Sequence, residues 1–242
     1  MDSQRLILVD GSGYIFRAFY ALPPMSRGDG TPVNAVFGFT SMLLKLSEDM
    51  QGENILVVFD AARTTFRNTI YKEYKANRSD PPEELVPQFD LIKEATTAIG
   101  LKSLEVENYE ADDIIATYVK IAKKENIETL IISSDKDLMQ LIQDGVSLHD
   151  PMKNIKIGPE AVLEKFGVNP DKVIDVQALA GDSSDNVPGV PGIGVKTASQ
   201  LINEFGSLEN LLVNASSIKQ EKRRESLLNN AELARISKKL VS

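Results

Sequence analysis

Cysteine is absent from the 242-residue sequence, and histidine occurs once, at His149. The absence of cysteine excludes disulfide bonds and thiolate metal sites, and a single histidine excludes a histidine-rich zinc site. Any metal ion must therefore be held by oxygen ligands, which is the ligand type that Mg²⁺, Mn²⁺ and Ca²⁺ prefer.

A long apolar run is also missing at the amino terminus. The polar segment Met1–Arg5 leads into the apolar residues Leu6–Val9, which are too few for a signal-peptide core or a membrane span. We therefore expect a cytoplasmic protein with no membrane partner. The net charge of −8 argues against nucleic-acid binding, unless the acids gather in one metal-filled site and the bases lie elsewhere.

Three short apolar runs predict buried strands, at Leu6–Val9, Ile55–Phe59 and Thr129–Ile132. A further short strand is possible at Leu104–Glu107. Segments with a helical pattern separate these runs, which predicts an α/β fold with a mainly parallel central sheet flanked by helices. One predicted helix covers Tyr14–Ala21. Another runs to about Asp49 with Asn34 as its cap, and its residues available for the core are Phe37, Met42, Leu43, Leu44 and Leu46.

An acidic residue follows each of the three clear strands. Asp10 and Asp60 end the first two, and Asp135 and Asp137 follow the third. Ligand sites in parallel sheets lie beyond the carboxyl ends of the strands. In extended backbone Asp135 and Asp137 face the same side, whereas Lys136 faces away. A turn or cap role explains one such aspartate, but three strand ends of this kind favour a binding site.

A second acidic group precedes the predicted helix Ile114–Lys124. Glu110, Asp112 and Asp113 lie within four positions, and the helix dipole favours negative charge at this end. Three carboxylates are more than this effect requires, because like charges about 4 Å apart repel by roughly 4 kcal/mol at an effective dielectric near 20. Asp182 and Asp185, in a polar loop, bring the number of acids to nine. Two Mg²⁺ ions held by such a set can position a phosphodiester and activate water.

A basic segment follows Asp60. Residues Arg63, Arg67, Tyr71, Lys75 and Arg78 are spaced by four, four, four and three positions, so a helix would align them on one face, with Tyr74 beside them. A solvated surface is the simpler explanation of a basic stripe, but interleaved tyrosines favour contacts with phosphates and bases. Lys75 and Arg78 are placed to contact the phosphate at the acidic site. Pro81–Pro82 breaks this helix, and a second one is predicted at Glu84–Ile99.

The composition changes near Asn169–Pro170, where a small helical region begins with a predicted helix at Asp171–Ala180. Closely spaced glycines from Gly189 to Gly194 precede a predicted helix at Val195–Phe205. Backbone N–H groups of such a turn can approach a phosphate, as in helix-hairpin-helix contacts with the DNA backbone, although a plain turn is the alternative. The chain ends in an amphipathic run with no closing turn, which indicates a fragment of a longer protein.

These motifs together resemble the flap-endonuclease superfamily, and within it the 5′-nuclease domains of the bacterial DNA polymerase I type. The resemblance covers nearly the whole chain, in order, and is carried by Leu8–Gly11, Val57–Asp60, Tyr74–Arg78, Tyr109–Asp113, Ser134–Asp137 and Gly181–Gly189. It implies a PIN-like nuclease core at residues 1–168 that includes a helical arch at about 63–99, followed by a helix-three-turn-helix DNA-binding region at 169–242.

The resemblance also implies an activity and its partners. The expected reactions are 5′→3′ exonuclease and structure-specific 5′-flap endonuclease cleavage in DNA replication and repair. The expected substrates are DNA with a 5′ flap, a nick or a 5′ end, and RNA primer–DNA junctions. Two Mg²⁺ ions, with Mn²⁺ as a substitute, are the expected cofactors, and K⁺ is expected at the helix-three-turn-helix. The protein is expected to be monomeric and to be followed by a polymerase region.

The resemblance also implies a role for individual residues of each matching motif. The more tightly bound metal would be held by Asp10, Asp60, Glu110, Asp112 and Asp113, of which Asp113 is also assigned to catalysis together with Lys75 and Arg78. The second metal would be held by Asp135, Asp137, Asp182 and Asp185. The residues expected to contact DNA are Arg17, Arg67, Tyr71, Tyr74, Lys75, Arg78, Gly189, Gly192, Ile193, Gly194, Lys196 and Thr197.

Three alternatives differ in what they leave unexplained. A non-catalytic DNA-structure-binding module should have lost some of the acids, and all are present. A small-molecule phosphatase usually has Asp-x-Asp after its first strand, whereas Gly11 and Ser12 follow Asp10 here. An RNA-directed nuclease of related fold generally lacks the helix-three-turn-helix. Nucleotide-binding loops are also disfavoured, because Phe16 replaces the third glycine of a dinucleotide fingerprint and no Walker A lysine is present.

Overall fold

The computed structural model describes residues 5–51 and 53–242, so most of the amino-terminal segment on which the absence of a signal peptide was argued lies outside the described residues. The chain divides into two compact units. Unit 1 runs up to Arg63 and continues through Asp80–Asp135 and Asp144–Lys156. Unit 2 comprises Thr64–Ser79, Lys136–Gln143 and Ile157–Ser242.

A six-stranded sheet with the order β3-β2-β1-β4-β5-β6 forms the centre of the α/β part. The strands are β1 (Leu6–Asp10), β2 (Asn54–Val58), β3 (Lys102–Leu104), β4 (Thr129–Ile132), β5 (Val146–Asp150) and β6 (Ile155–Ile157). The pairs β1–β2, β1–β4, β2–β3 and β4–β5 are parallel, which confirms the predicted sheet. The strand order changes direction between β1 and β4, where ligand sites of parallel sheets lie.

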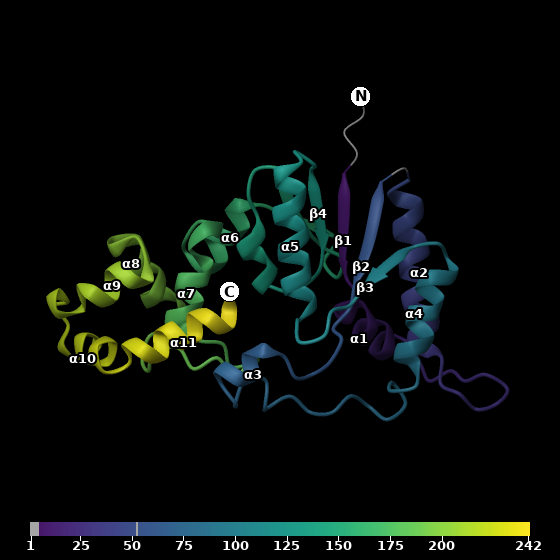
Figure 1. Cartoon of the computed structure of the whole chain (residues 1–242), viewed down its shortest axis with the longest axis horizontal. Helices are drawn as coiled ribbons and strands as arrows, with labels where there is room; N and C mark the ends of the chain where they lie inside the picture. The colour runs from purple at the N-terminus through teal and green to yellow at the C-terminus, as the bar shows by residue number, and fades with distance from the viewer. Residues whose placement is uncertain (1–4, 52) are drawn as a thin grey trace. The chain divides into compact units, whose positions relative to one another are not determined.

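Both faces of this sheet are covered by helices of unit 1 (Figure 1). The helices are α1 (Gly11–Ala21), α2 (Asn34–Asp49), α4 (Gln88–Ala98) and α5 (Ala111–Lys124). Alternate strand residues such as Ile7, Val9 and Val57 pack with Phe39 and Leu43 of α2 in one buried cluster. The helix α5 covers the opposite face, so the central strands β1 and β4 are mainly apolar, as expected for a parallel sheet.

Unit 2 is mainly helical. Its elements are α3 (Phe66–Ile70), η1 (Asp137–Leu141), α6 (Pro159–Phe166), η2 (Pro170–Lys172), α7 (Val173–Ala180), α8 (Val195–Phe205), α9 (Leu208–Val213), η3 (Ala215–Ser217), α10 (Glu221–Asn229) and α11 (Ala231–Val241), where η marks a 3₁₀ helix. The buried helix α7 packs against α8 and α11. Over the described part of the chain, none of the helices combines the length and apolarity that a membrane crossing requires.

The predicted role of Asn34 as a helix cap is wrong. Val33 occupies the cap position, and the Asn34 side chain is buried inside the first turn of α2. Its Nδ2 donates to Phe19 O at 3.0 Å, and its Oδ1 accepts from Gln88 Nε2 at 2.9 Å. The buried face of α2 also differs from the predicted one. Leu43 and Leu46 are buried and Met42 is partly buried, but Phe37 and Leu44 are exposed.

The continuous basic helix predicted from Arg63 to Arg78 is also wrong. Only α3 is helical there, and turns follow it from Tyr71. Lys75 has a φ of 55°, which a right-handed helix does not allow. Other predicted boundaries shift by a few residues: α4 begins at Gln88 rather than Glu84, and β3 ends at Leu104 where a strand was expected to begin.

Candidate active site

Asp10 occupies the centre of the carboxyl edge of the sheet. It is the last residue of β1 and caps α1, since its Oδ1 accepts from Gly13 N at 3.1 Å. Its Oδ2 accepts from Ser133 Oγ at 2.7 Å, just beyond the end of β4. The pKa of Asp10 is raised from 3.8 to about 6 in total. Burial raises it most, the two hydrogen bonds lower it, and the charges of Asp60 and Asp135 add a smaller rise.

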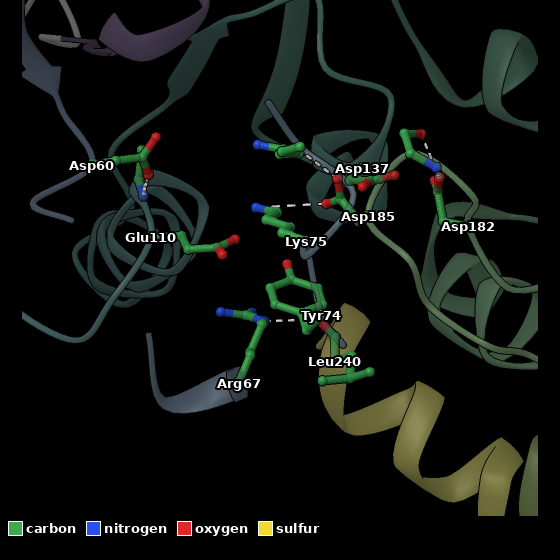
Figure 2. Close-up of polar contacts among 12 residues, drawn as sticks. Asp60, Arg67, Tyr74, Lys75, Glu110, Asp137, Asp182, Asp185 and Leu240 are labelled. Carbon is green, nitrogen blue, oxygen red and sulfur yellow. Dashed lines mark hydrogen bonds and ion pairs between the residues drawn. The ribbon is translucent and has the colours of Figure 1, made fainter. Parts of the chain in front are cut away.

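Asp60 and Asp135 lie at the same edge as Asp10, which their electrostatic effect on its pKa requires. Asp60 Oδ1 accepts from Ala111 N, the first residue of α5, at 2.7 Å (Figure 2). Asp135 N donates to Ser133 Oγ at 2.9 Å, so this one hydroxyl bridges Asp10 and Asp135. Three of the four strand-end acids, Asp10, Asp60 and Asp135, therefore lie close together within unit 1, and their metal-binding role stays a prediction.

The acidic group at the start of α5 is organised as a helix cap. The helix begins at Ala111, three residues before the predicted start, and Glu110 is its N-cap. Glu110 and Asp113 form a capping box, in which Asp113 Oδ2 accepts from Glu110 N at 2.9 Å. Glu110 is buried, whereas Asp112 and Asp113 are half-buried. The hydrogen bond from Ala111 N connects this helix start to Asp60.

The acids of unit 1 suit a divalent cation by their chemistry. The donors to Asp10 and Asp60 are neutral, so the repulsion among Asp10, Asp60 and Asp135 is not offset by them. In the described parts of the chain, however, no three such side chains already lie in a geometry that would hold a metal ion. The structure therefore shows a rim of carboxylates and not a formed coordination sphere.

The acids of unit 2 are arranged differently, because cations or amides contact them. Asp182 forms an ion pair with Lys136, and its Oδ1 accepts from Ser184 N at 2.8 Å. Burial alone would raise the pKa of Asp182, but the hydrogen bonds from Lys136 and Ser184 outweigh burial and lower it. Asp137 Oδ1 accepts from Gln177 Nε2 at 2.6 Å.

Asp185 is paired with the two cations predicted to contact the substrate. Its carboxylate lies 3.6 Å from Lys75 Nζ (Figure 2) and 2.5 Å from Arg78 Nη2.

The prediction that Asp135 and Asp137 face the same side of an extended backbone is wrong, because the backbone at Lys136 is helical (φ −67°, ψ −25°) and Asp137 opens η1. Consequently Asp135 belongs to unit 1 and Asp137 to unit 2.

The basic segment separates into exposed and buried members. Arg67 is buried, and its Nε and Nη2 donate to Leu240 O at 2.7 Å and Ser242 O at 2.9 Å, so that it satisfies the last carbonyls of the chain (Figure 2). Tyr74 is buried against Leu240, with Tyr71 partly buried beside it. These contacts join Arg67 of α3, and Tyr74 in the turn after it, to Leu240 of α11. The DNA contacts of Arg67 and Tyr74 stay a prediction.

The residues of the glycine turn before α8 also differ in their exposure to solvent. Gly192 is exposed with a φ of 79°, Gly194 is the N-cap of α8, Lys196 is exposed and Thr197 is half-buried. Two other residues of this segment are buried, and their DNA contacts stay a prediction. The side chain of Ile193 is buried. Gly189 is also buried, its N donates to Ser237 Oγ at 2.9 Å, and a Cβ there would lie 2.4 Å from Gly181 N.

Several residues that organise the site were not predicted from the sequence. Ser133 was detectable, since it follows a strand directly, as the predicted acids do. Lys136 was placed facing away and instead contacts Asp182. Asn77 and Asn186, whose side-chain amides bond to backbone carbonyls elsewhere in unit 2, carried no signal. Arg17, the remaining predicted phosphate contact, is half-buried on α1 near Tyr14, whose phenol pKa is raised by burial and lowered by the Arg17 charge.

Two family models match the chain end to end. Residues 5–167 match the N-terminal resolvase-like domain of 5′-3′ exonucleases, and residues 168–242 match their C-terminal SAM fold. The chain belongs to the 5′-3′ exonuclease family. Within the family it is 54% identical over 244 residues to DNA polymerase I of Rhizobium leguminosarum, and 45% identical over 243 residues to DNA polymerase I of Bacillus caldotenax.

These alignments cover 98% and 99% of this chain but only 24% and 28% of the two relatives. The chain thus spans about a quarter of the length of the curated relatives it matches. Among solved structures, T5 5′-exonuclease with bound zinc is 25% identical with a TM-score of 0.82, and the alignment covers 98% of this chain and 89% of that one. The catalytic core of Rad2 with DNA, at 16% identity and a TM-score of 0.60 over 96% of this chain and 73% of that one, shares the fold.

Proposed function

We propose that this chain hydrolyses phosphodiester bonds of DNA as a divalent-metal-dependent 5′→3′ exonuclease and structure-specific 5′-flap endonuclease. Membership of the 5′-3′ exonuclease family supports the reaction class. The T5 flap endonuclease, at 25% identity and a TM-score of 0.80, has been solved in complex with DNA and metal ions, which supports the metal dependence and the substrate.

The observation that carries the proposal is the rim of carboxylates in unit 1. Asp10, Asp60 and Asp135 meet at the sheet edge where the strand order reverses, and the pKa of Asp10 is raised there by burial and, to a smaller extent, by the charges of the other two. Carboxylate oxygens suit Mg²⁺ or Mn²⁺. Bound ions of this kind supply Lewis-acid and water-activating chemistry to phosphodiester cleavage.

We assign the acids to two Mg²⁺ ions by motif. One ion would be held by Asp10, Asp60, Glu110, Asp112 and Asp113, and the other by Asp135, Asp137, Asp182 and Asp185. Asp113 is the acid we assign most directly to catalysis. The capping box holds its Oδ2 on Glu110 N and so fixes the side chain at the start of α5.

Lys75 and Arg78 are proposed to contact the scissile phosphate and to offset its developing charge. Both already bind a carboxylate, that of Asp185, which indicates that their charges are directed toward anionic oxygen. Arg17 and Tyr71 are further proposed contacts with DNA. Gly192, Gly194, Lys196 and Thr197 would grip the duplex backbone through N–H groups and one ammonium group, with K⁺ as a further cofactor.

The wider assignments rest on the relatives. The proposed substrates are DNA with a 5′ flap, nick or 5′ end and RNA primer–DNA junctions, in replication and repair, with a monomeric protein in the cytoplasm. The DNA polymerase I relatives support a following polymerase region. The junction of the two family models at residues 167 and 168 supports division into a nuclease core at 1–168, with its arch at about 63–99, and a DNA-binding region at 169–242.

One experiment tests the proposal directly. The protein is incubated with a duplex that carries a labelled 5′ flap, in Mg²⁺ and in EDTA, and the products are sized. We expect short 5′ products in Mg²⁺, none in EDTA, and none from a matched duplex with a 3′ flap. Equal cleavage in EDTA would refute the metal dependence, and equal cleavage of the 3′ flap would refute the polarity.

A further inference from the structure

Two segments of unit 2 that carry proposed active-site residues are joined by hydrogen bonds between distant parts of the sequence. The turn Glu73–Arg78 lies against the loop Asp182–Asn186, and Lys75 N donates to Asp185 O at 2.9 Å. The side chains of Asn77 and Asn186 add two bonds in opposite directions. Asn77 Nδ2 donates to Ser183 O at 2.8 Å, and Asn186 Nδ2 donates to Glu73 O at 2.6 Å.

The backbone at this junction has an unusual conformation. Lys75 and Asn186 both have a φ of 55°, in the left-handed region that residues with a Cβ rarely adopt. Asparagine tolerates this region, but lysine does not favour it. Such a conformation persists only where surrounding contacts enforce it. Here the contacts include the hydrogen bond from Lys75 N to Asp185 O and the hydrogen bonds that the side-chain amides of Asn77 and Asn186 donate.

The direction of the Lys75 side chain depends on this backbone conformation. With φ at 55°, the ammonium group lies 3.6 Å from the carboxylate of Asp185 (Figure 2), with which Arg78 also pairs. Relaxation of the turn to an ordinary φ would rotate the Cα–Cβ bond of Lys75 and move its ammonium group away from this position. The amides of Asn77 and Asn186 therefore act on Lys75 without touching its side chain.

We propose that Asn77 and Asn186 are positioning residues for the cleavage reaction, which act through Lys75 by holding its turn against the loop that carries Asp182 and Asp185. The inference rests on the proposed function. It adds that this turn and this loop form one hydrogen-bonded piece, so that loosening the loop displaces the ammonium group of Lys75.

Kinetics of single and double variants test the proposal. Asn186→Gly keeps the left-handed backbone accessible and removes only the amide, and Asn77→Ala removes the other amide. We expect each to lower kcat about tenfold, with KM and duplex affinity in Ca²⁺ changed less than threefold. The control is Asn126→Gly, at a residue after α5 with a φ of 54° and no role in the site, for which kcat should equal that of the wild type.

Combination with Lys75→Ala shows whether the asparagines act through Lys75. If they do, the double variant Lys75→Ala/Asn186→Gly should cleave no more slowly than Lys75→Ala alone. Multiplicative losses, or an unchanged kcat in both single asparagine variants, would overturn the proposal.

Amide hydrogen exchange supplies a readout that does not depend on activity. In the metal-free protein, Asn186→Gly should speed exchange at the Lys75 N–H about tenfold and leave the strands of the sheet unchanged. Unchanged exchange at Lys75 would also overturn the proposal. If the wild type fails to cleave but exchange at Lys75 responds as expected, the proposed function is wrong while the positioning contact stands.

Discussion

The acids of unit 1 and unit 2 differ in what surrounds them. In unit 1, the groups that donate to Asp10 and Asp60 are uncharged, and the pKa of Asp10 is raised to about 6. In unit 2, Lys136 is paired with Asp182 and Lys75 with Asp185, and the pKa of Asp182 is lowered. The donors to Asp10 and Asp60 thus bring no positive charge, whereas Asp182 and Asp185 already have cations of their own.

Removal of a carboxylate from the rim of unit 1 should have the largest effect. We expect Asp135→Asn to lower kcat at least about 1,000-fold, equivalent to about 4 kcal/mol of barrier, because an amide holds a divalent ion more weakly than a carboxylate. DNA binding in Ca²⁺ should stay within about threefold of the wild type, measured by fluorescence anisotropy.

The control for this variant is Asp144→Asn, an exposed acid outside the rim, which should cleave like the wild type. Loss of the folded state in Asp135→Asn, seen by circular dichroism, would show that Asp135 serves structure rather than metal binding.

Removal of a cation that is paired with an acid of unit 2 should have the next largest effect. Lys75→Ala is expected to reduce kcat about 100-fold and to leave KM within about threefold, because the ammonium group offsets charge that develops in the transition state. Steady-state kinetics on the 5′-flap substrate measures both quantities. Lys72→Ala, at an exposed position three residues earlier, is the matched control. A rise in KM at constant kcat would mean that Lys75 only binds substrate.

The internal ion pair should contribute to stability above acidic pH. Because the pKa of Asp182 is lowered in the folded state, its contribution is present above the unfolded value near 3.8 and is lost as the pH falls through the folded value. Asp182→Asn should therefore lower the free energy of unfolding by about 2 kcal/mol at pH 7 in EDTA, with a smaller loss at pH 3. Urea denaturation measures both. An equal loss at the two pH values would argue against an electrostatic origin.

Asp10 should show the opposite sign and the smallest effect. Its raised pKa favours the protonated form in the folded state, so the metal-free protein loses stability as the pH rises from about 4 through about 6. The full shift corresponds to about 3 kcal/mol, partly offset by altered hydrogen bonds in the variant. We expect Asp10→Asn to raise the free energy of unfolding by about 1 kcal/mol at pH 7.5 in EDTA and not at pH 4. A destabilised variant at pH 7.5 would show that the hydrogen bonds from Ser133 and Gly13 outweigh the repulsion.

Local sequence pattern was a good guide to the strands and to several helices. Thr129–Ile132 and Val195–Phe205 begin and end where predicted, because apolar period and glycine act over a few residues. The local pattern gave a wrong prediction where a side chain bonds to a residue far along the chain. The spacing of Arg67 indicated a surface base, yet its partner Leu240 lies 173 residues away. Asn34 was predicted to cap a helix, but its side chain accepts a hydrogen bond from Gln88.

The parallel sheet, the acids at its strand ends and the oxygen-only character of any metal site could be predicted from the amino-acid sequence. Residue type and short-range order suffice for these properties. The folded structure was needed to show which acids meet at the rim of unit 1, which are paired with Lys75, Lys136 or Arg78, and which bases are buried. Electrostatic pairing acts across a few ångströms of space between segments that lie far apart along the chain, and that proximity is a property of the fold.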